Sequence, residues 1–240
     1  MTTGNHIHNK SARFPAQNGL KRIKERVAAN YTGDPETAIA STLFTILSGF
    51  GPLPAKLMNK DFLANLGGYL LPLITTSHYP KRQLLLSAGH VASSVYFSQK
   101  GLVRGFYMHK KTGKEITDFL WRERSVITVP NSFFKQQPSQ LFIEAMPGTQ
   151  LLSISFHHLM ACLKKYPVLE IFSRNVILQY HAYETKRNHE LSSLSAWERY
   201  IELLNLHPDI EQKVTKEVIA SYLHIMPQSL SRMLKERGHP

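Results

Sequence analysis

The spacing of hydrophobic residues predicts a polar tail and two short helices at the start of the chain. Residues 1–35 are basic and polar and keep no sustained period, which predicts a disordered basic tail. Over residues 37–48, and again over 55–66, apolar side chains recur at three- and four-residue steps. This spacing predicts two helices, and the glycine pair at 67–68 is expected to end the second.

From Tyr69 onward the pattern changes to short apolar runs separated by glycine, proline and asparagine. Such runs predict strands, and the residues between them predict turns. The predicted strands cover residues 84–86, 91–97, 102–109, 115–121, 125–129, 141–145 and 150–155. Short strands at this spacing indicate an all-β sandwich or barrel, of which a jelly roll is one closed form.

Helical periodicity returns after the last strand. It predicts a short helix over 157–166, a long helix over 168–191 and a further helix over 192–206. One stripe of the long helix is apolar or aromatic and consists of Leu169, Phe172, Val176 and Tyr183. This stripe can pack against the chain's own strands or pair with a second copy across a two-fold axis. We favour the second use, because DNA-reading helix pairs commonly work as dimers, and we take the stripe as the predicted dimer interface.

Residues 215–240 predict two short helices joined by a tight corner. Thr215 can cap the first helix, and Pro227 suits the first position of the second. The buried faces are marked by apolar residues at helical spacing, which are Val218, Ile219, Tyr222 and Leu223, then Leu230, Met233 and Leu234. Two helices with a corner of this length are typical of a helix-turn-helix.

The outward face of the second helix carries side chains that suit DNA. These side chains are Gln228, Ser229, Ser231, Arg232 and Lys235. Glutamine can bond an adenine edge and arginine a guanine edge, while serine and lysine can reach phosphates. Thr215 and Lys216, at the start of the first helix, complete the candidate DNA-binding residues. The alternative is an ordinary helical hairpin whose polar face is only solvated.

Charge supports an anionic partner but does not place it. The 240 residues carry a net charge of +12 and a pI near 9.8, which favours nucleic acid or a membrane surface. Residues 192–240 nevertheless contain six Lys/Arg and six Asp/Glu. DNA binding would therefore depend on the local placement of Lys216, Arg232 and Lys235 rather than on bulk charge.

Several classes of protein are excluded by what the sequence lacks. Cys162 is the single cysteine, which rules out a disulfide framework, a cysteine zinc site and an iron–sulfur cluster held by one chain. The 12 histidines are scattered, so we expect no metal site. No run reaches the ~18 apolar residues of a membrane span, and we expect a cytoplasmic protein. No catalytic motif is present, so we predict no enzyme and no catalytic residues.

Three stretches resemble the CRP/FNR family of bacterial transcription regulators, in particular its Bacteroidetes-like branch. They are Gly101-Leu-Val-Arg-Gly-Phe-Tyr with Lys111-Thr-Gly-Lys-Glu, then Asn131-Ser-Phe-Phe-Lys-Gln-Gln-Pro-Ser, then Ile219-Ala-Ser-Tyr-Leu with Leu230-Ser-Arg. The resemblance covers about residues 40–237.

The resemblance implies an α+β protein in three parts after the tail over 1–35, which has no counterpart in the family. N-terminal helices and an antiparallel, jelly-roll-like β-roll effector domain cover 36–166. A dimerisation helix over 167–191 and a helix-turn-helix DNA-binding domain over 192–240 follow. The implied partners are double-stranded DNA, a second copy of the chain and an unknown small-molecule effector, and RNA polymerase stands as a further candidate.

The chain departs from the family's pattern for cyclic nucleotides. Family members that bind them use an Arg-Ser pair for the cyclic phosphate, and Ser139-Gln140 stand near that place here. No arginine occurs between Arg124 and Arg174. Since a phosphate needs such a partner to offset its desolvation, we expect that the roll does not bind cAMP in the usual way. A different pocket could use Asn131, Ser132, Phe133, Phe134, Ser139 and Gln140, although the two phenylalanines are more often plain core.

Two functions remain open from the sequence. The first is a homodimeric DNA-binding regulator in which Gln228, Ser229 and Arg232 read bases. The second is a ligand-binding or protein-interaction module of the same fold that no longer reads DNA, which the neutral C-terminal segment would suit. A steep loss of duplex affinity with salt separates the first from the second.

Overall fold

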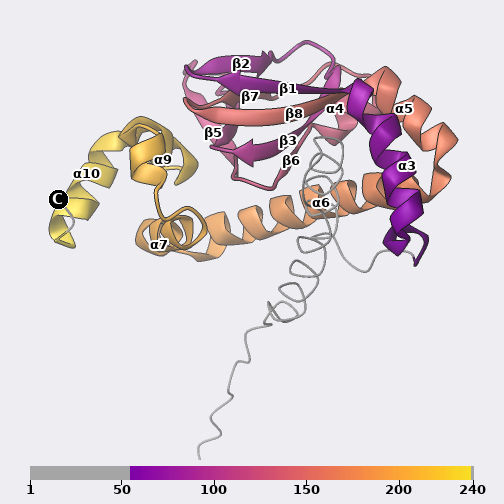
Figure 1. The fold of residues 1–240 in the computed structure, drawn as a ribbon. Helices are drawn as coiled ribbons and strands as arrows, with labels where there is room; N and C mark the ends of the chain where they lie inside the picture. Colours follow the sequence, from indigo (N-terminus) through magenta and orange to yellow (C-terminus); the bar gives the residue numbers. More distant parts are fainter. Residues whose placement is uncertain (1–54, 239–240) are drawn as a thin grey trace, which may run out of the picture.

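The computed structural model describes residues 55–238, which form a β-roll, a long helix and a C-terminal group of short helices (Figure 1). The tail expected over 1–35 and the helix expected over 37–48 lie outside the described residues. The α+β architecture predicted from the sequence is confirmed for the described part.

The described part opens with η1 (Ala55–Met58) and α3 (Lys60–Leu70). Asn59 caps α3, because its side chain accepts a hydrogen bond from the Phe62 amide at 2.9 Å. The expected stop at the glycine pair is wrong, since α3 continues through Gly67 and Gly68. A glycine weakens a helix by only about 1 kcal/mol, whereas Pro72, in η2 (Leu71–Leu73), ends the α-helical hydrogen bonding.

The roll consists of two four-stranded antiparallel sheets. The first has the order β1-β8-β3-β6 and the second the order β2-β7-β4-β5 (Figure 1). The strands are β1 (Ile74–Tyr79), β2 (Gln83–Leu86), β3 (Ser94–Lys100), β4 (Val103–Met108), β5 (Glu115–Trp121), β6 (Val126–Ile127), β7 (Phe142–Ala145) and β8 (Thr149–Ser155). Seven of them match the predicted runs, while β1 was missed, because Ile74 is its only aliphatic residue.

Inward-facing side chains of both sheets form the main core. Burial alternates over 94–97 of β3, as expected of a strand with one covered face, whereas the neighbours Leu151 and Leu152 of β8 are both buried. The fully buried residues of the main core include Val103, Ile127, Phe133, Leu151 and Leu152. A second cluster of similar size joins the C-terminal helices to the roll through Leu102, Leu120 and Met146, and a smaller one lies between α3, α5 and the start of α6.

A short helix, α4 (Pro130–Lys135), interrupts the roll where the sequence predicted only a turn. Pro130 begins it, and Gln136 ends it in the left-handed region at φ 51°. After β8 follow α5 (Phe156–Lys165), η3 (Pro167–Leu169) and α6 (Glu170–Ser193), close to the predicted bounds.

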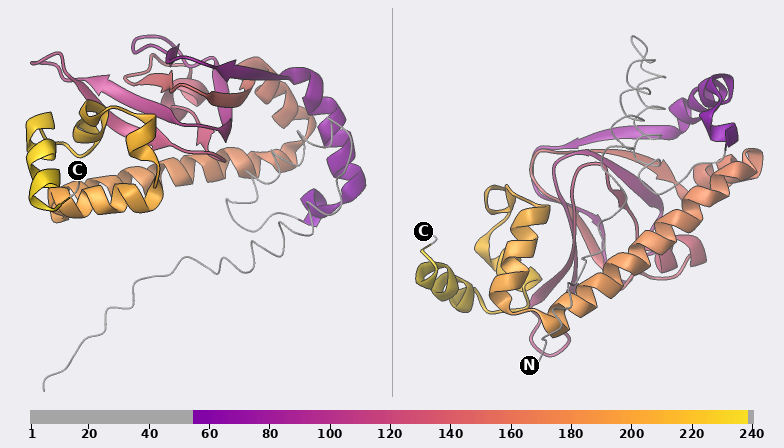
Figure 2. Two further views of the ribbon diagram at one scale, coloured as in Figure 1. Left: turned by 60° about the vertical axis from the view of Figure 1, so that its left-hand side comes forward. Right: turned by 90° about the horizontal axis from the view of Figure 1, so that it is seen from below.

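The long helix α6 lies along the roll and reaches the C-terminal helices (Figures 1 and 2). Tyr180 and Tyr183 stack on Phe119 of β5 with ring centroids 4.9 and 4.8 Å apart. The Tyr183 hydroxyl also donates a hydrogen bond to the main-chain oxygen of Asp118 at 3.0 Å. Packing against the roll, one of the two uses predicted for this helix, is therefore present within a single chain.

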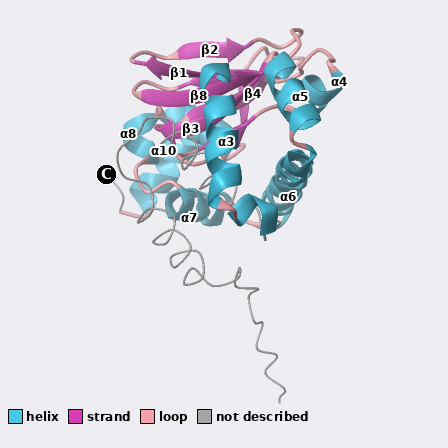
Figure 3. Cartoon of the chain, turned by 45° about the vertical axis from the view of Figure 1, so that its right-hand side comes forward, coloured by secondary structure: helices cyan, strands magenta, loops and turns pink. Residues whose placement is uncertain are grey.

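The C-terminal helices are α7 (Ala196–Leu206), α8 (Ile210–Lys213), α9 (Lys216–Tyr222) and α10 (Pro227–Glu236), and they gather beyond one end of α6 (Figure 3). The helix predicted from residue 192 begins at Ala196, because Ser195 and Glu198 form a reciprocal capping box there. Among the described residues, no helix is both long and apolar enough to cross a membrane.

Replacing Phe119 by alanine is expected to lower the free energy of unfolding by about 3–5 kcal/mol. The ring is 2% exposed and contacts Trp121, Tyr180 and Tyr183, so its removal leaves a cavity between the roll and α6. Urea denaturation measures the change. Met108→Ala, at a side chain that is 42% exposed, is the control and should cost less than about 0.5 kcal/mol. Equal effects of the two changes would contradict this packing.

The free energy of unfolding should also decrease as the pH is lowered, because the buried His207 ring resists protonation in the folded chain. Burial, with the nearby charges of Arg122 and Lys213, lowers the pKa of this ring from 6.5 to about 4. The unfolded chain takes up the proton near pH 6.5 while the folded chain does not, so stability present above pH 6.5 is lost towards pH 4.

Urea denaturation between pH 7 and pH 4 measures this loss, which should approach about 1.4 kcal/mol per pH unit. His207→Gln should remove this part of the slope, whereas His157→Gln, at an exposed histidine, should leave it. A slope that His207→Gln does not change would contradict the assignment.

Candidate nucleic-acid interface

The helix-turn-helix is built on a buried apolar base. The side chains that face inward from α9 and α10 are Val218, Ile219, Ala220, Leu223, Leu230 and Leu234, all less than 9% exposed. They pack on α7 and α8 through Tyr200, Leu203 and Ile210. Every residue predicted for this buried face is buried except Met233, which is partly buried against the same cluster.

The corner between α9 and α10 depends on His224. This residue adopts the left-handed conformation at φ 52°, a region that histidine tolerates better than most side chains. The turn is closed by the Ile225 amide, which donates to the Ala220 carbonyl at 3.0 Å. Pro227 then begins α10, and Met226 supplies no side-chain cap. The chain thus changes direction by backbone geometry alone.

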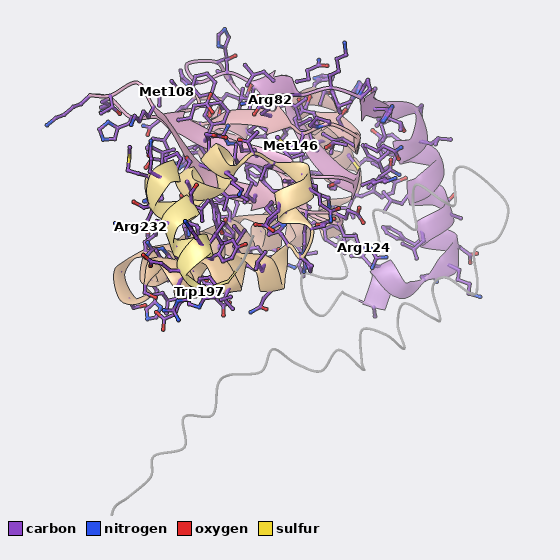
Figure 4. The ribbon with its side chains drawn as sticks, turned by 90° about the vertical axis from the view of Figure 1, so that its left-hand side faces the viewer. Arg82, Met108, Arg124, Met146, Trp197 and Arg232 are labelled. Carbon is purple, nitrogen blue, oxygen red and sulfur yellow. The ribbon has the colours of Figure 1, made fainter. Side chains whose placement is uncertain are left out.

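The polar face of α10 points to solvent. Gln228, Ser231, Arg232 and Lys235 are exposed, and Ser229 is partly buried. The Arg232 side chain is 77% exposed, and its only ion pair among the described residues is a loose one to Glu236 at 3.9 Å. Figure 4 shows Arg232 on α10, at the edge of the molecule. Its guanidinium is therefore available to a base edge or a phosphate.

The remaining candidate DNA contacts lie at the start of α9. Thr215 occupies the cap position, but its side chain bonds no amide of the helix. Its hydroxyl instead lowers the pKa of the Glu217 carboxyl. Thr215 and Lys216 are both exposed, so they can contact a backbone phosphate, although Glu217 places a negative charge beside them.

The opposite side of α9 is docked on the β4–β5 hairpin. The Ser221 hydroxyl accepts a hydrogen bond from the Thr117 amide and donates one to the Glu115 carbonyl, both at 2.8 Å. Sequence reasoning missed this role. Ser221 follows Ala220 on a short helix, and nothing in the spacing indicates that a strand edge lies beside it.

Side chains of α6 and α7 contact the C-terminal end of α9. The hydroxyls of Tyr183 and Tyr222 lie 3.2 Å apart. Arg187 donates a hydrogen bond to the Tyr222 carbonyl and stacks on the Tyr222 ring at 3.8 Å. Arg199 donates to the Leu223 carbonyl at 2.9 Å. These carbonyls end α9 without an intrahelical partner, so arginine donors suit them.

The residues predicted for a ligand pocket in the roll do not converge on one pocket. Phe133 is fully buried between Phe134 and Phe156, with ring centroids 5.1 and 5.3 Å away. Asn131 and Gln140 are exposed. Phe133 therefore serves as core, whereas Phe134 is partly buried and lines an apolar cavity between the roll, α3, α5 and α6.

The two predicted serines hold the loop around α4 together. The Ser132 hydroxyl accepts from the Ala92 amide at 2.9 Å and donates to the Gln137 carbonyl at 2.6 Å. The Ser139 hydroxyl donates to the Leu141 carbonyl at 2.8 Å and accepts from its amide at 3.0 Å. Both hydroxyls are thus used inside the protein.

Three of the four residues predicted for a dimer interface, Leu169, Phe172 and Tyr183, pack against the chain itself. Leu169 and Phe172 belong to the cluster with Leu57, Leu66 and Cys162. Tyr183 stacks on Phe119, as described above. The exposed face of α6 carries other apolar side chains, Ile177 and Leu178, which are 44% and 58% exposed.

Within residues 55–238, no three His, Cys, Asp or Glu side chains are placed to hold a metal ion. Cys162 is buried, and burial raises the pKa of its thiol to about 11.

Comparisons of the sequence give no match, either to a family model or to a curated protein. Solved structures do match. A protein of Eubacterium rectale assigned to the Crp/Fnr family of transcriptional regulators has a TM-score of 0.61 at 17% identity, covering 79% of this chain and 87% of that one.

Two further solved structures also match this chain. The c-di-GMP-responsive global regulator CLP of Xanthomonas campestris has a TM-score of 0.58 at 15% identity, covering 73% of this chain and 91% of its own. FixK2 of Bradyrhizobium japonicum has a TM-score of 0.57 at 18% identity, covering 69% and 86%. The chain therefore has the fold of the CRP/FNR-type transcriptional regulators.

Proposed function

We propose that the protein is a DNA-binding transcriptional regulator, acts as a homodimer in the cytoplasm and has no enzymatic activity. The observation that carries the proposal is the exposed polar face of α10, which is fixed from behind by buried Leu230 and Leu234. A recognition helix needs this combination, because its base-reading side chains must reach into the major groove from a rigid support.

The proposed base contacts are Gln228, Ser229 and Arg232, with Ser231, Lys235, Thr215 and Lys216 on the backbone. Arg232 is the strongest candidate for a bidentate contact to guanine, since its guanidinium is exposed and only loosely paired. The Ser231 hydroxyl already donates to the Pro227 carbonyl at 3.1 Å. To donate to a phosphate oxygen, this hydroxyl would have to turn away from the Pro227 carbonyl.

We also propose that the roll, taken as an effector domain over 36–166, does not bind cAMP in the usual way. The support comes from the hydrogen bonds of two serines and from the lack of an arginine. The Ser132 and Ser139 hydroxyls are taken by the loop, and Phe133 occupies the interior behind them. No arginine side chain in the sequence from 125 to 173 is available for a cyclic phosphate.

The dimer is proposed to form through the exposed face of α6, within the connecting segment 167–191. Ile177 and Leu178 are large apolar side chains that the chain's own roll does not cover. In the stripe predicted from the sequence, Leu169 and Phe172 pack on η1, α3 and α5 and Tyr183 packs on the roll, so the twin helix would contact the other side.

A module that no longer reads DNA is the second candidate. The observation in its favour is the charge balance of residues 192–240, where six Lys/Arg are offset by six Asp/Glu. Glu217 and Glu236 stand close to the proposed contacts and would weaken the attraction of phosphates. Binding to double-stranded DNA distinguishes the two functions. RNA polymerase would be a partner of the regulator only.

Arg232→Ala should weaken binding to a duplex selected from a random pool by about 1–3 kcal/mol and relax the preference at one base pair. Fluorescence anisotropy at several salt concentrations measures both the affinity and its salt slope. Lys164→Ala removes an exposed positive charge on α5 and is the control. No duplex affinity above that for random sequence would favour the second candidate.

Leu178→Glu should raise the dimer dissociation constant by about tenfold or more, because it places a charge in an apolar contact. Analytical ultracentrifugation over a range of protein concentrations measures it. Met108→Glu makes the same change at an exposed apolar residue of the β4–β5 hairpin and should leave the dimer intact. A dimer unaffected by Leu178→Glu would place the interface elsewhere.

Titration calorimetry with cAMP and with cGMP at millimolar concentration should show no saturable binding that is lost when Ser139 is replaced by alanine. The comparison is the wild-type chain against Ser139→Ala, since Ser139 stands near the family's phosphate-binding pair. Saturable binding that Ser139→Ala abolishes would show that the roll holds a cyclic phosphate at the usual place.

A further inference from the structure

The turn of the β4–β5 hairpin presents three lysines to solvent. Lys110, Lys111 and Lys114 lie within residues 109–114, which we call the hairpin tip, and all three side chains are exposed. Within residues 55–238, none of their amino groups forms an ion pair with a carboxylate. Three cations on one short turn repel one another, so an anionic partner would lower their electrostatic free energy.

Main-chain hydrogen bonds hold the hairpin tip in one conformation. The His109 amide donates to the Lys114 carbonyl at 2.8 Å, and the Gly113 amide donates to the His109 carbonyl at 2.9 Å. Gly113 adopts φ 64°, a region that favours glycine. Nδ1 of His109 accepts from the amides of Lys111 and Thr112 at 3.3 and 3.2 Å. The main chain of the tip is therefore ordered before any contact forms, which lowers the entropy cost of binding.

Negative charge close to the hairpin tip is already balanced. Glu115, the first residue of β5, accepts a hydrogen bond from the buried Arg104 at 2.5 Å and lies 3.7 Å from Arg82. On the neighbouring strand β7, Glu144 pairs with the same Arg82 at 2.6 Å. Two arginines thus compensate two carboxylates behind the tip, and the three lysine charges remain uncompensated.

The hairpin is attached to the helix-turn-helix at two places. Directly behind the tip, the Thr117 amide and the Glu115 carbonyl both bond to the Ser221 hydroxyl of α9. At the other end of the hairpin, Leu102 and Leu120 belong to the same buried cluster as the C-terminal helices. Because polar and apolar contacts both join the hairpin to this unit, the position of the tip relative to α10 is set.

The hairpin tip extends to the side of the molecule on which α10 lies. Figure 4 shows Met108, the last residue of β4, and Arg232 of α10 on the same side, and the left view of Figure 2 shows the hairpin and α10 at one edge. At about 3.3 Å per residue, the tip reaches about 15 Å beyond Thr117, where the hairpin meets α9. A helix with its side chains is only about 10–12 Å across. The tip therefore extends past α9, although the base of the hairpin docks behind it.

The helix-turn-helix itself has little positive charge to offer a duplex. Residues 192–240 contain six Lys/Arg and six Asp/Glu, so the whole positive excess of the chain lies in residues 1–191. On the proposed reading face, Lys216 adjoins Glu217, and Arg232 lies 3.9 Å from Glu236. Affinity for DNA depends strongly on how many phosphates are neutralised. A second source of cations beside α10 would supply what this unit lacks.

We infer that the hairpin tip is a second DNA-contacting element, in which Lys110, Lys111 and Lys114 bind backbone phosphates of the duplex that α10 reads. The inference rests on the proposed function and extends it to a part of the roll. Phosphate contacts carry no sequence information, so the tip raises the affinity for every duplex by a similar factor and leaves the choice of sequence to α10. An acidic protein surface would also fit three lysines, but the position of the tip beside the proposed reading face favours DNA.

Fluorescence anisotropy of the full chain tests the contact on two duplexes, one selected from a random pool and one of random sequence. The variant with Lys110→Gln, Lys111→Gln and Lys114→Gln should bind both duplexes about tenfold more weakly, or weaker still, at about 0.1 M salt. The slope of log affinity against log salt should become shallower by about 2–3, because each lost phosphate contact removes about 0.9. The ratio of the two affinities should stay unchanged, whereas Arg232→Ala should reduce it.

The matched control removes the same charge elsewhere. It combines Lys60→Gln, Lys135→Gln and Lys164→Gln, at exposed lysines of α3, α4 and α5. These helices lie at the opposite end of the roll from α10 (Figure 1). The control should keep the wild-type salt slope and an affinity within about twofold of wild type, because only its bulk charge has changed. Circular dichroism melting checks that both triple variants are folded.

The outcomes separate this inference from the proposed function. Equal affinities and salt slopes in the hairpin variant and the control would overturn the inference, and the lysines would then suit an acidic protein surface instead. A wild-type chain that binds the selected duplex no more tightly than the random one would contradict sequence-specific regulation, while the hairpin variant would still decide the phosphate contact on random duplex. Absence of binding to either duplex would overturn both.

Discussion

The stack of Tyr180 and Tyr183 on Phe119 fixes the long helix against the roll, and the rest of the arrangement depends on it. The same Tyr183 pairs its hydroxyl with Tyr222 at the end of α9, so a single side chain touches both the effector-like roll and the helix-turn-helix. Loss of the Phe119 ring would therefore loosen two interfaces at once. Leu169 and Phe172 hold the start of the same helix against α3 and α5.

The docking of the helix-turn-helix joins apolar packing to specific polar contacts. Ser221 satisfies one amide and one carbonyl of β5, and Arg187 and Arg199 satisfy carbonyls at the end of α9. Unpaired main-chain groups at a helix end or strand edge are costly when buried, so this position of α9 is favoured over a merely adjacent one. Meanwhile the outward face of α10 makes no contact with the roll. The side of the domain that holds the protein together and the side proposed to read DNA are thus opposite faces of one small unit.

Buried polar side chains differ in their hydrogen bonding between the loop around α4 and the junction with α6. Around α4, the two serines predicted for a ligand pocket form hydrogen bonds with main-chain groups, and Phe133 fills the interior. At the junction with α6, the buried Arg187 and Thr128 keep unused hydrogen-bonding capacity beside a cavity.

The sequence by itself determined the elements and their order, because strand and helix periods, turn glycines and Pro227 are local signals that act within a few residues. It also determined which face of α10 is polar, since the inward positions of a short amphipathic helix follow from spacing alone. Local signals failed at Gly67-Gly68, where α3 continues, and at Pro130, where a proline begins a helix instead of a turn. Only the tertiary structure decided which side of α6 meets the roll, how Ser221 is used and where Arg187 and Thr128 come together. Those outcomes depend on contacts between residues 39 to 104 positions apart, and the spacing of side chains along one element does not specify its neighbour.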